Sequence, residues 1–134
     1  MLTNEITMES RLSLIPATIE KLRSDPELRF RLDGREPAFC VAISEALANA
    51  ITHGNRNEPS KNVYVRWTCE LDGAVSILVR DEGNGFNPGD IEIAKDIGED
   101  RNRGIRLMRS CMDEIQFRHN GTEVYMRINA CQRP

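Results

Sequence analysis

The sequence lacks the features that would place the protein in a membrane or on a secretion pathway. It has no apolar run as long as the roughly 18 residues that a membrane-spanning helix needs. Its first residues, MLTNEITMES, do not show the basic-then-apolar order of a signal peptide. From these two absences we expect a soluble protein that works in the cytoplasm and has no membrane partner.

The sequence also lacks a cluster of basic residues and any closely spaced pair of cysteines. A net charge of -3 without a basic patch disfavours direct nucleic-acid binding as the main task. The sequence has no C-x-x-C pair and no histidine close to a cysteine, so a zinc site is not expected. We expect the cysteines to be reduced thiols. The cysteines are Cys40, Cys69, Cys111 and Cys131.

Length and composition favour a single domain. A chain of 134 residues lies within the usual size range of a domain, and 40% hydrophobic residues are enough to form a packed core. No internal repeat or low-complexity tract divides the sequence. We therefore expect residues 1–134 to form one domain.

We expect the rest of the chain to be organised around the stretch from Phe39 to Asn55, FCVAISEALANAITHGN. At about 3.6 residues per helical turn, its apolar residues form one stripe, and Glu45, Asn49 and His53 recur along a neighbouring ridge. Gly54 is typical of a helix end. A carboxylate and a carboxamide beside an apolar face suit a site at the edge of a core. Taken alone, the stretch also fits an amphipathic helix with solvated polar residues.

The residues before this helix predict a strand and one further helix. Ile6 and Met8 alternate with polar residues, as in a half-buried strand. The segment from Leu14 to Arg23 has helical periodicity, and we expect Ser13 to be its N-cap. Asp25-Pro26 is then expected to break the helix.

Beyond the central helix, the hydrophobic period changes to two. Residues 63–71 and 74–80 each have one apolar face, and Asp72-Gly73 between them predicts a hairpin turn. A second hairpin is predicted over residues 114–129 around Asn120-Gly121. Strands that are apolar on one side only predict an antiparallel or mixed sheet with helices packed on one face.

The first hairpin leads directly into Asp81-Glu82-Gly83-Asn84-Gly85-Phe86. Glycines let the backbone approach a flat base or phosphates, and a carboxylate at a strand end can accept the exocyclic N–H of adenine. The same residues also suit an ordinary acidic, glycine-rich turn. Residues 87–103 then form a long polar connection, which after such a motif suggests a lid.

A helix is predicted from Ile105 to Asp113, opened by Gly104. Its N-terminal amides and partial positive charge would favour an anion at this end. Helical periodicity places five of its residues toward the core, and these are Ile105, Leu107, Met108, Cys111 and Met112.

Taken in order, these motifs resemble the GHKL ATPase superfamily. Within it, the phrases SEALANAITHGN and RGIRLMRSCMDEI are most similar to bacterial anti-sigma-factor serine/threonine kinases, and the similarity covers roughly Asn4 to Ala130. The resemblance implies a Bergerat-type α+β sandwich with a mixed, largely antiparallel sheet, helices on one face and an ATP lid. The residues that carry it are Glu45-x-x-x-Asn49, Asp81-x-Gly83-x-Gly85, Gly104 and Gly121-Thr122.

The resemblance also implies a role for individual residues. Glu45 would be the catalytic base that accepts the proton of a protein serine or threonine hydroxyl, and Asn49 would bind Mg²⁺. Asp81 would read adenine N6 with the help of Thr122. The remaining residues implied to bind the nucleotide are Gly83, Gly85 and Gly104.

Several side chains are candidates for contacts with the phosphates. His53 would touch phosphate or orient Glu45, but a helix-end histidine bound to carbonyl groups is an equal alternative. Arg103 and Arg101 are both available for the lid arginine that some relatives place near the terminal phosphate. Asn102 stands where the family usually has a lid glycine.

The implied function is an ATP- and Mg²⁺-dependent serine/threonine kinase that phosphorylates a small antagonist protein and sequesters a sigma factor. The resemblance also implies a homodimer. Because Asn102 departs from the lid motif, a second hypothesis is a nucleotide-binding module without useful kinase activity, which exchanges protein partners as its lid becomes ordered.

Overall fold

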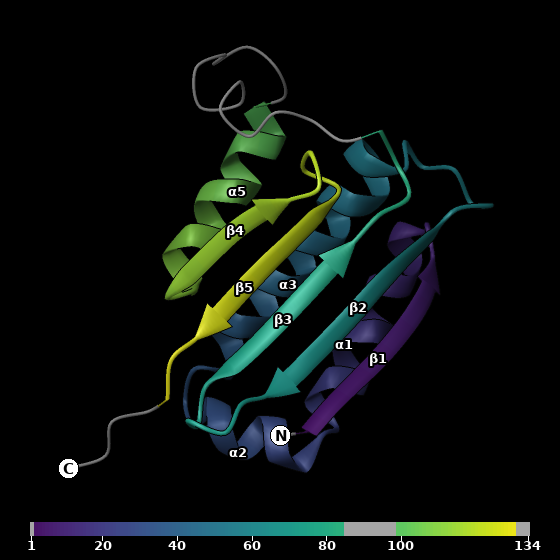
Figure 1. Ribbon diagram of the computed structural model, residues 1–134. Helices are drawn as coiled ribbons and strands as arrows, with labels where there is room; N and C mark the ends of the chain where they lie inside the picture. The colour runs from purple at the N-terminus through teal and green to yellow at the C-terminus, as the bar shows by residue number, and fades with distance from the viewer. Residues whose placement is uncertain (1, 85–98, 131–134) are drawn as a thin grey trace.

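A computed structural model describes residues 2–84 and 99–130, with the side chains at 99–102 left aside. These residues form two layers, and Figure 1 shows the helices lying on one face of a five-stranded sheet. The strand order is β1-β2-β3-β5-β4, and each of the four neighbouring pairs is antiparallel. The α+β sandwich expected from the sequence is therefore confirmed.

The elements follow one another in the order that the sequence patterns predict, with one additional helix. The strands are β1 (Leu2–Glu9), β2 (Asn62–Cys69), β3 (Val75–Arg80), β4 (Glu114–Arg118) and β5 (Glu123–Ile128). The helices are the 3₁₀ turn η1 (Leu12–Leu14), α1 (Ile15–Arg23), α2 (Pro26–Leu32), α3 (Glu36–Asn49), the π-helical turn η2 (Ala50–Gly54) and α5 (Glu99–Cys111).

The core lies between α3 and the inner face of the sheet. Phe39, Ile43 and Leu47 of α3 are at most 2% exposed, as the apolar stripe predicts. They belong to one hydrophobic cluster with the inward residues of the strands, among them Ile77 and Trp67. Helix α3 also packs against α5, so the helix that carries the polar ridge is held from two sides.

One expectation for the N-terminal half is wrong, and one helix was not predicted. Ser13 is not a helix cap, because η1 precedes α1 and the cap position falls on Leu14, which makes no side-chain cap hydrogen bond. Asp25-Pro26 does end α1, but it also begins α2, which the sequence analysis did not predict. A proline in the first turn of a helix is well tolerated, so the same dipeptide serves both as a stop and as a start.

Three expectations for the C-terminal half also need correction. Leu71 is 87% exposed, because β2 ends at Cys69 and Leu71 lies in the turn that follows. Leu107 is 37% exposed and does not face the core, although Ile105 and Met108 do. Helix α5 begins at Glu99, so Gly104 lies inside it and does not open it.

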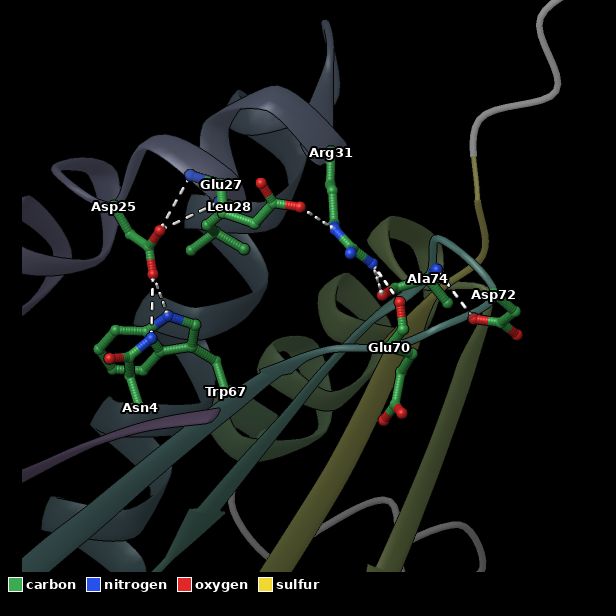
Figure 2. A network of polar contacts seen from close by, with 9 residues as sticks. All are labelled: Asn4, Asp25, Glu27, Leu28, Arg31, Trp67, Glu70, Asp72 and Ala74. Atoms are coloured by element: carbon green, nitrogen blue, oxygen red, sulfur yellow. Dashed lines mark hydrogen bonds and ion pairs between the residues drawn. The ribbon is translucent and has the colours of Figure 1, made fainter. Parts of the chain in front are cut away.

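Asp25 joins the start of α2 to the first two strands, as Figure 2 shows. Its Oδ1 accepts hydrogen bonds from the backbone amides of Glu27 at 3.0 Å and Leu28 at 3.2 Å, and so caps the helix. Its Oδ2 accepts from the indole N–H of Trp67 at 2.9 Å and from the side-chain amide of Asn4 at 3.2 Å. Trp67 is 5% exposed, so its N–H depends on this carboxylate for a partner.

Arg31 joins the other end of α2 to the β2–β3 hairpin (Figure 2). Its Nη1 donates to the carbonyl oxygen of Glu70 and, at 3.2 Å, to that of Ala74. Its Nε donates to Glu27 at 2.8 Å one helical turn away.

Within the described residues, no helix has the length and apolar character that a membrane crossing requires.

We expect Asp25→Ala to lower the free energy of unfolding by about 2–4 kcal/mol. The substitution removes a helix N-cap, worth about 1 kcal/mol, and leaves a buried indole N–H unpaired, which costs about 1–3 kcal/mol. Urea unfolding followed by circular dichroism measures the change. The control is Glu20→Ala, since Glu20 is an exposed acid 3.8 Å from Arg23. This substitution should change the free energy of unfolding by less than about 0.5 kcal/mol. Equal effects of the two substitutions would contradict the role given to Asp25.

Candidate functional site

The carboxylate of Glu45 and the side-chain amide of Asn49 lie together where α3 packs against α5. A Cβ atom at Gly104 would lie 2.8 Å from Glu45 Oε2 and 3.4 Å from Asn49 Nδ2. Both side chains are half-buried. Gly104 therefore lets the backbone of α5 approach the two polar groups that the sequence places one helical turn apart.

His53 follows Asn49 in a π-helical turn and not in the regular helix. The chain from Ala50 to Gly54 forms a π-helical turn, in which the backbone N–H of Asn55 donates to the carbonyl oxygen of Ala50 at 2.8 Å. His53 is half-buried in this turn, and its role at the phosphates stays a prediction.

Asp81 lies against the backbone at the end of η2. A Cβ atom at Gly54 would collide with the Asp81 carboxylate, and one at Gly83 would collide with the Gly54 carbonyl group. The backbone N–H of Gly83 donates to Asp81 Oδ1 at 2.8 Å. Two glycines thus allow the end of the central helix and the turn after β3 to touch. The approach of Gly83 to a nucleotide stays a prediction.

A pocket opens between the C-terminal half of α3, α5 and the ends of β3 and β5. The space inside its lining is about 340 Å³ with open solvent included. Its wall is mostly apolar, with a few polar groups from α3 and the strand ends. The lining residues are Ala46, Asn49, Ala50, Val79, Asp81, Met108, Phe117, Gly121, Thr122 and Val124.

Two polar groups of this pocket, on Asp81 and Thr122, are placed to accept hydrogen bonds. Thr122 Oγ1 donates its proton to the carbonyl oxygen of His119 at 2.8 Å, so the lone pairs of the hydroxyl are what it offers to a ligand. An ionised Asp81 carboxylate is an acceptor only. The backbone N–H of Asp81 donates to the carbonyl oxygen of Thr122 at 2.9 Å, which holds the two acceptors side by side.

The structure brings together most of the residues that the sequence singled out. Asn49, Asp81 and Thr122 line one pocket, and Glu45 and Gly104 lie beside Asn49. The apolar wall was not predicted as part of the site. Its α3 members, Ala46 and Ala50, could have been found from their position beside Asn49 on a helix, but the contributions of Met108 and Phe117 have no signal in local sequence.

The predicted lid falls largely outside the described residues. Gly85 and residues 87–98 are not described, whereas residues 99–103 belong to α5 and not to a loop. The backbone at Asn102 is helical, a conformation that any residue other than proline adopts, so a glycine is not required there. Arg103 is exposed on this helix, and its contact with a phosphate stays a prediction.

Comparisons with known proteins agree with this arrangement. Residues 18–128 match the model of the histidine kinase-like ATPase domain family. A protein named anti-sigma F factor from Geobacillus stearothermophilus is 37% identical over 103 residues, which cover 69% of this chain and 68% of that protein. Its namesake from Priestia megaterium is 33% identical over 95 residues, or 65% of each chain. About a third of each relative therefore lies outside the match.

Two solved structures share the fold at low sequence identity. The RsbU and RsbW domains of a Mycobacterium tuberculosis protein superpose with a TM-score of 0.64 at 17% identity, over 97% of this chain and 32% of that one. The histidine kinase domain of a blue-light activated histidine kinase from Erythrobacter litoralis gives a TM-score of 0.55 at 18% identity, over 89% and 58% of the two chains.

We expect alanine at Gly83 to destabilise the protein more than alanine at Gly104. At Gly104 the new Cβ meets the far end of the flexible Glu45 side chain, which can move. Alanine in place of glycine also stabilises a helix interior by about 1 kcal/mol. At Gly83 it meets the Gly54 backbone, which cannot move without disturbing η2, so a loss of about 1–3 kcal/mol is expected. Urea unfolding compares the two variants, and equal stability would contradict the close packing of Gly83 on Gly54.

Proposed function

The chain belongs to the histidine kinase-like ATPase domain family, and on this premise we propose that it binds ATP with Mg²⁺ and phosphorylates a serine or threonine of a protein. One observation carries the proposal. Asn49 lines the pocket together with Asp81, and it also lies with Glu45 against Gly104. The Asn49 side chain thereby connects the pocket proposed for the adenine ring with the carboxylate proposed to accept the hydroxyl proton.

The acceptor character of the pocket favours adenine over guanine. Asp81 and Thr122 can both accept from the exocyclic amino group of adenine, directly or through a water. Guanine places a carbonyl oxygen at the corresponding position, where it would face these acceptors. The apolar residues of the pocket, such as Val79 and Met108, suit the faces of a flat ring.

Asn49 is the residue that would hold Mg²⁺, through its side-chain oxygen. Among the described residues, no three histidine, cysteine, aspartate or glutamate side chains gather in a way that could hold a metal ion. Mg²⁺ is commonly held by one or two protein oxygens together with water and substrate phosphates, and the Asn49 oxygen would be one of them. Bound there, the ion would neutralise charge on the phosphate oxygens.

Glu45 is proposed to act as the general base. A serine or threonine hydroxyl oxygen forms a bond to the terminal phosphorus of ATP, the bond from that phosphorus to the bridging oxygen breaks, and ADP leaves. The hydroxyl proton passes to the Glu45 carboxylate. The close approach of Gly104 restricts where this carboxylate can lie, so positioning is part of its contribution.

The partners in this proposal come from the names of the relatives. Because two relatives at 33% and 37% identity are named anti-sigma F factor, we infer that this chain sequesters a sigma factor and that its phosphorylated substrate is the small antagonist of that complex. A cytoplasmic location, a single domain over residues 1–134 and a homodimer belong to the same proposal. Light scattering of the purified protein tests the dimer.

We expect Glu45→Gln to reduce phosphoryl transfer by about 10²–10⁴-fold, which is the usual contribution of a general base. The affinity for ATP should change by less than about threefold, since Glu45 does not line the base pocket. Transfer of labelled terminal phosphate from ATP to the cognate antagonist measures the first effect, and equilibrium dialysis measures the second.

The matched control is Glu36→Gln at the other end of α3, where the carboxylate pairs with Arg23 at 2.7 Å. This variant should transfer phosphate at the wild-type rate. If Glu45→Gln does so too, Glu45 is not the base. If wild-type protein binds partners in an ATP-dependent manner without any transfer, the nucleotide-dependent binding module is the correct function.

We expect Asp81→Asn to weaken ATP binding by about tenfold or more and to narrow the preference for ATP over GTP. A carboxamide replaces a charged acceptor by a neutral one and adds a donor that guanine can use. Equilibrium dialysis with both nucleotides in the presence of Mg²⁺ measures the two affinities. If the affinities for ATP and GTP are both unchanged, the adenine ring does not bind at Asp81.

A further inference from the structure

Asn55 is a fully buried polar residue that follows η2, with 0% of its surface exposed. Its Nδ2 donates to Ser10 Oγ at 2.5 Å and to the carbonyl oxygen of Asn62 at 2.9 Å. Its Oδ1 accepts from the backbone N–H of Glu82 at 2.7 Å. The side chain thus connects the segment after β1, the first residue of β2 and the segment after β3.

This set of partners selects a carboxamide. Two acceptors lie at one end of the side chain and one donor lies at the other, which matches the NH₂ group and the oxygen of asparagine. Aspartate at this position would turn an oxygen toward the carbonyl group of Asn62. An aliphatic residue would leave the Glu82 amide without its protein partner.

The bond to Glu82 acts on Asp81, the preceding residue. The Cα atom of Asp81 lies between two peptide N–H groups, and both are held. Its own N–H donates to the carbonyl oxygen of Thr122 at 2.9 Å, and the next one, that of Glu82, donates to Asn55 at 2.7 Å. Fixing both flanking peptides restricts the backbone of Asp81 and therefore the direction of its side chain.

Asn55 also holds the backbone that the Asp81 carboxylate touches. Gly54 precedes Asn55 directly, and there is no room for a Cβ between Gly54 and the carboxylate. The backbone N–H of Asn55 donates to Ala50 and closes the π turn. One residue therefore determines the place of the surface behind Asp81 and the direction in which Asp81 leaves the sheet.

We propose that Asn55 is a positioning residue for purine selection, which acts by aiming the Asp81 carboxylate at the exocyclic amino group of adenine. The inference rests on the proposed function, in which Asp81 reads that group. It adds a residue that does not touch the nucleotide and that lies outside the pocket lining. Its consequence is that selectivity for adenine and the rest of nucleotide affinity depend on different residues.

A purely structural role for Asn55 would have a different effect. General loosening of the fold would weaken every nucleotide by a similar factor. Misdirection of Asp81 would weaken only ligands that have the amino group. The two roles are separated by comparing ATP with purine riboside triphosphate, which lacks the amino group and is otherwise the same ligand.

The experiment measures the dissociation constants of both ligands by equilibrium dialysis with Mg²⁺, for wild-type protein and for Asn55→Ala. A hydrogen bond to a charged acceptor should make wild-type protein prefer ATP by about 10- to 100-fold. In Asn55→Ala we expect this preference to fall below about threefold, with the dissociation constant of purine riboside triphosphate changed by less than about threefold. Circular dichroism at low temperature confirms that the variant is folded.

The matched control is Ser10→Ala. Ser10 is 3% exposed and bonds to the other end of the same side chain, so its loss disturbs the network without removing the bond to Glu82. It should keep the wild-type preference for ATP. If Asn55→Ala does not fold, Asn55→Ser replaces it, because a hydroxyl with a water can satisfy Ser10 and Asn62. The same loss of the preference for ATP is expected in this variant.

The outcomes distinguish the inference from the function beneath it. A folded Asn55 variant that retains the wild-type preference for ATP overturns the role of Asn55 and leaves the proposed function intact. Loss of the preference in Ser10→Ala to the same degree also overturns it, because the bond to Glu82 would then not be the cause. A wild-type protein with no preference overturns both, because Asp81 would then not read the amino group.

Discussion

The close contact between Gly54 and the Asp81 carboxylate is the constraint on which the site depends. It joins the end of the central helix to the end of β3, two segments that neither hydrophobic packing nor strand pairing would bring so close. Only residues without side chains at Gly54 and Gly83 allow the approach. The apolar core places α3 on the sheet, and this contact then determines how the last turn of the helix meets the pocket.

Patterns with a clear period could be predicted from sequence. The alternation in β2 and β3, the hairpin at Asp72-Gly73 and the stripe of α3 each follow from a local rule, because one face of each element is buried. The candidate site was predictable to the extent that it sits at the ends of these elements. Glu45 and Asn49 share a ridge because they are four residues apart on a regular helix.

The features that could not be predicted depend on contacts between distant segments. Nothing in the residues around Gly104 shows that α5 begins at Glu99, since the reason for a glycine there is the approach of Glu45 from α3. The π turn that contains His53 is likewise held by Asn55, whose partners are 7, 27 and 45 residues away. Asparagine before a polar loop looks like an ordinary turn residue, and only its burial shows otherwise.

The π turn has a consequence for how sequences of this family can vary in length. A π turn accommodates one residue more than an α turn, so a deletion between Ala50 and Gly54 could be absorbed by reversion to regular helix. The glycine would keep its direction around the helix axis, because five residues of a π turn span about the same angle as four residues of an α-helix. We therefore expect related chains that lack one residue in this turn to keep a glycine at the position that faces Asp81.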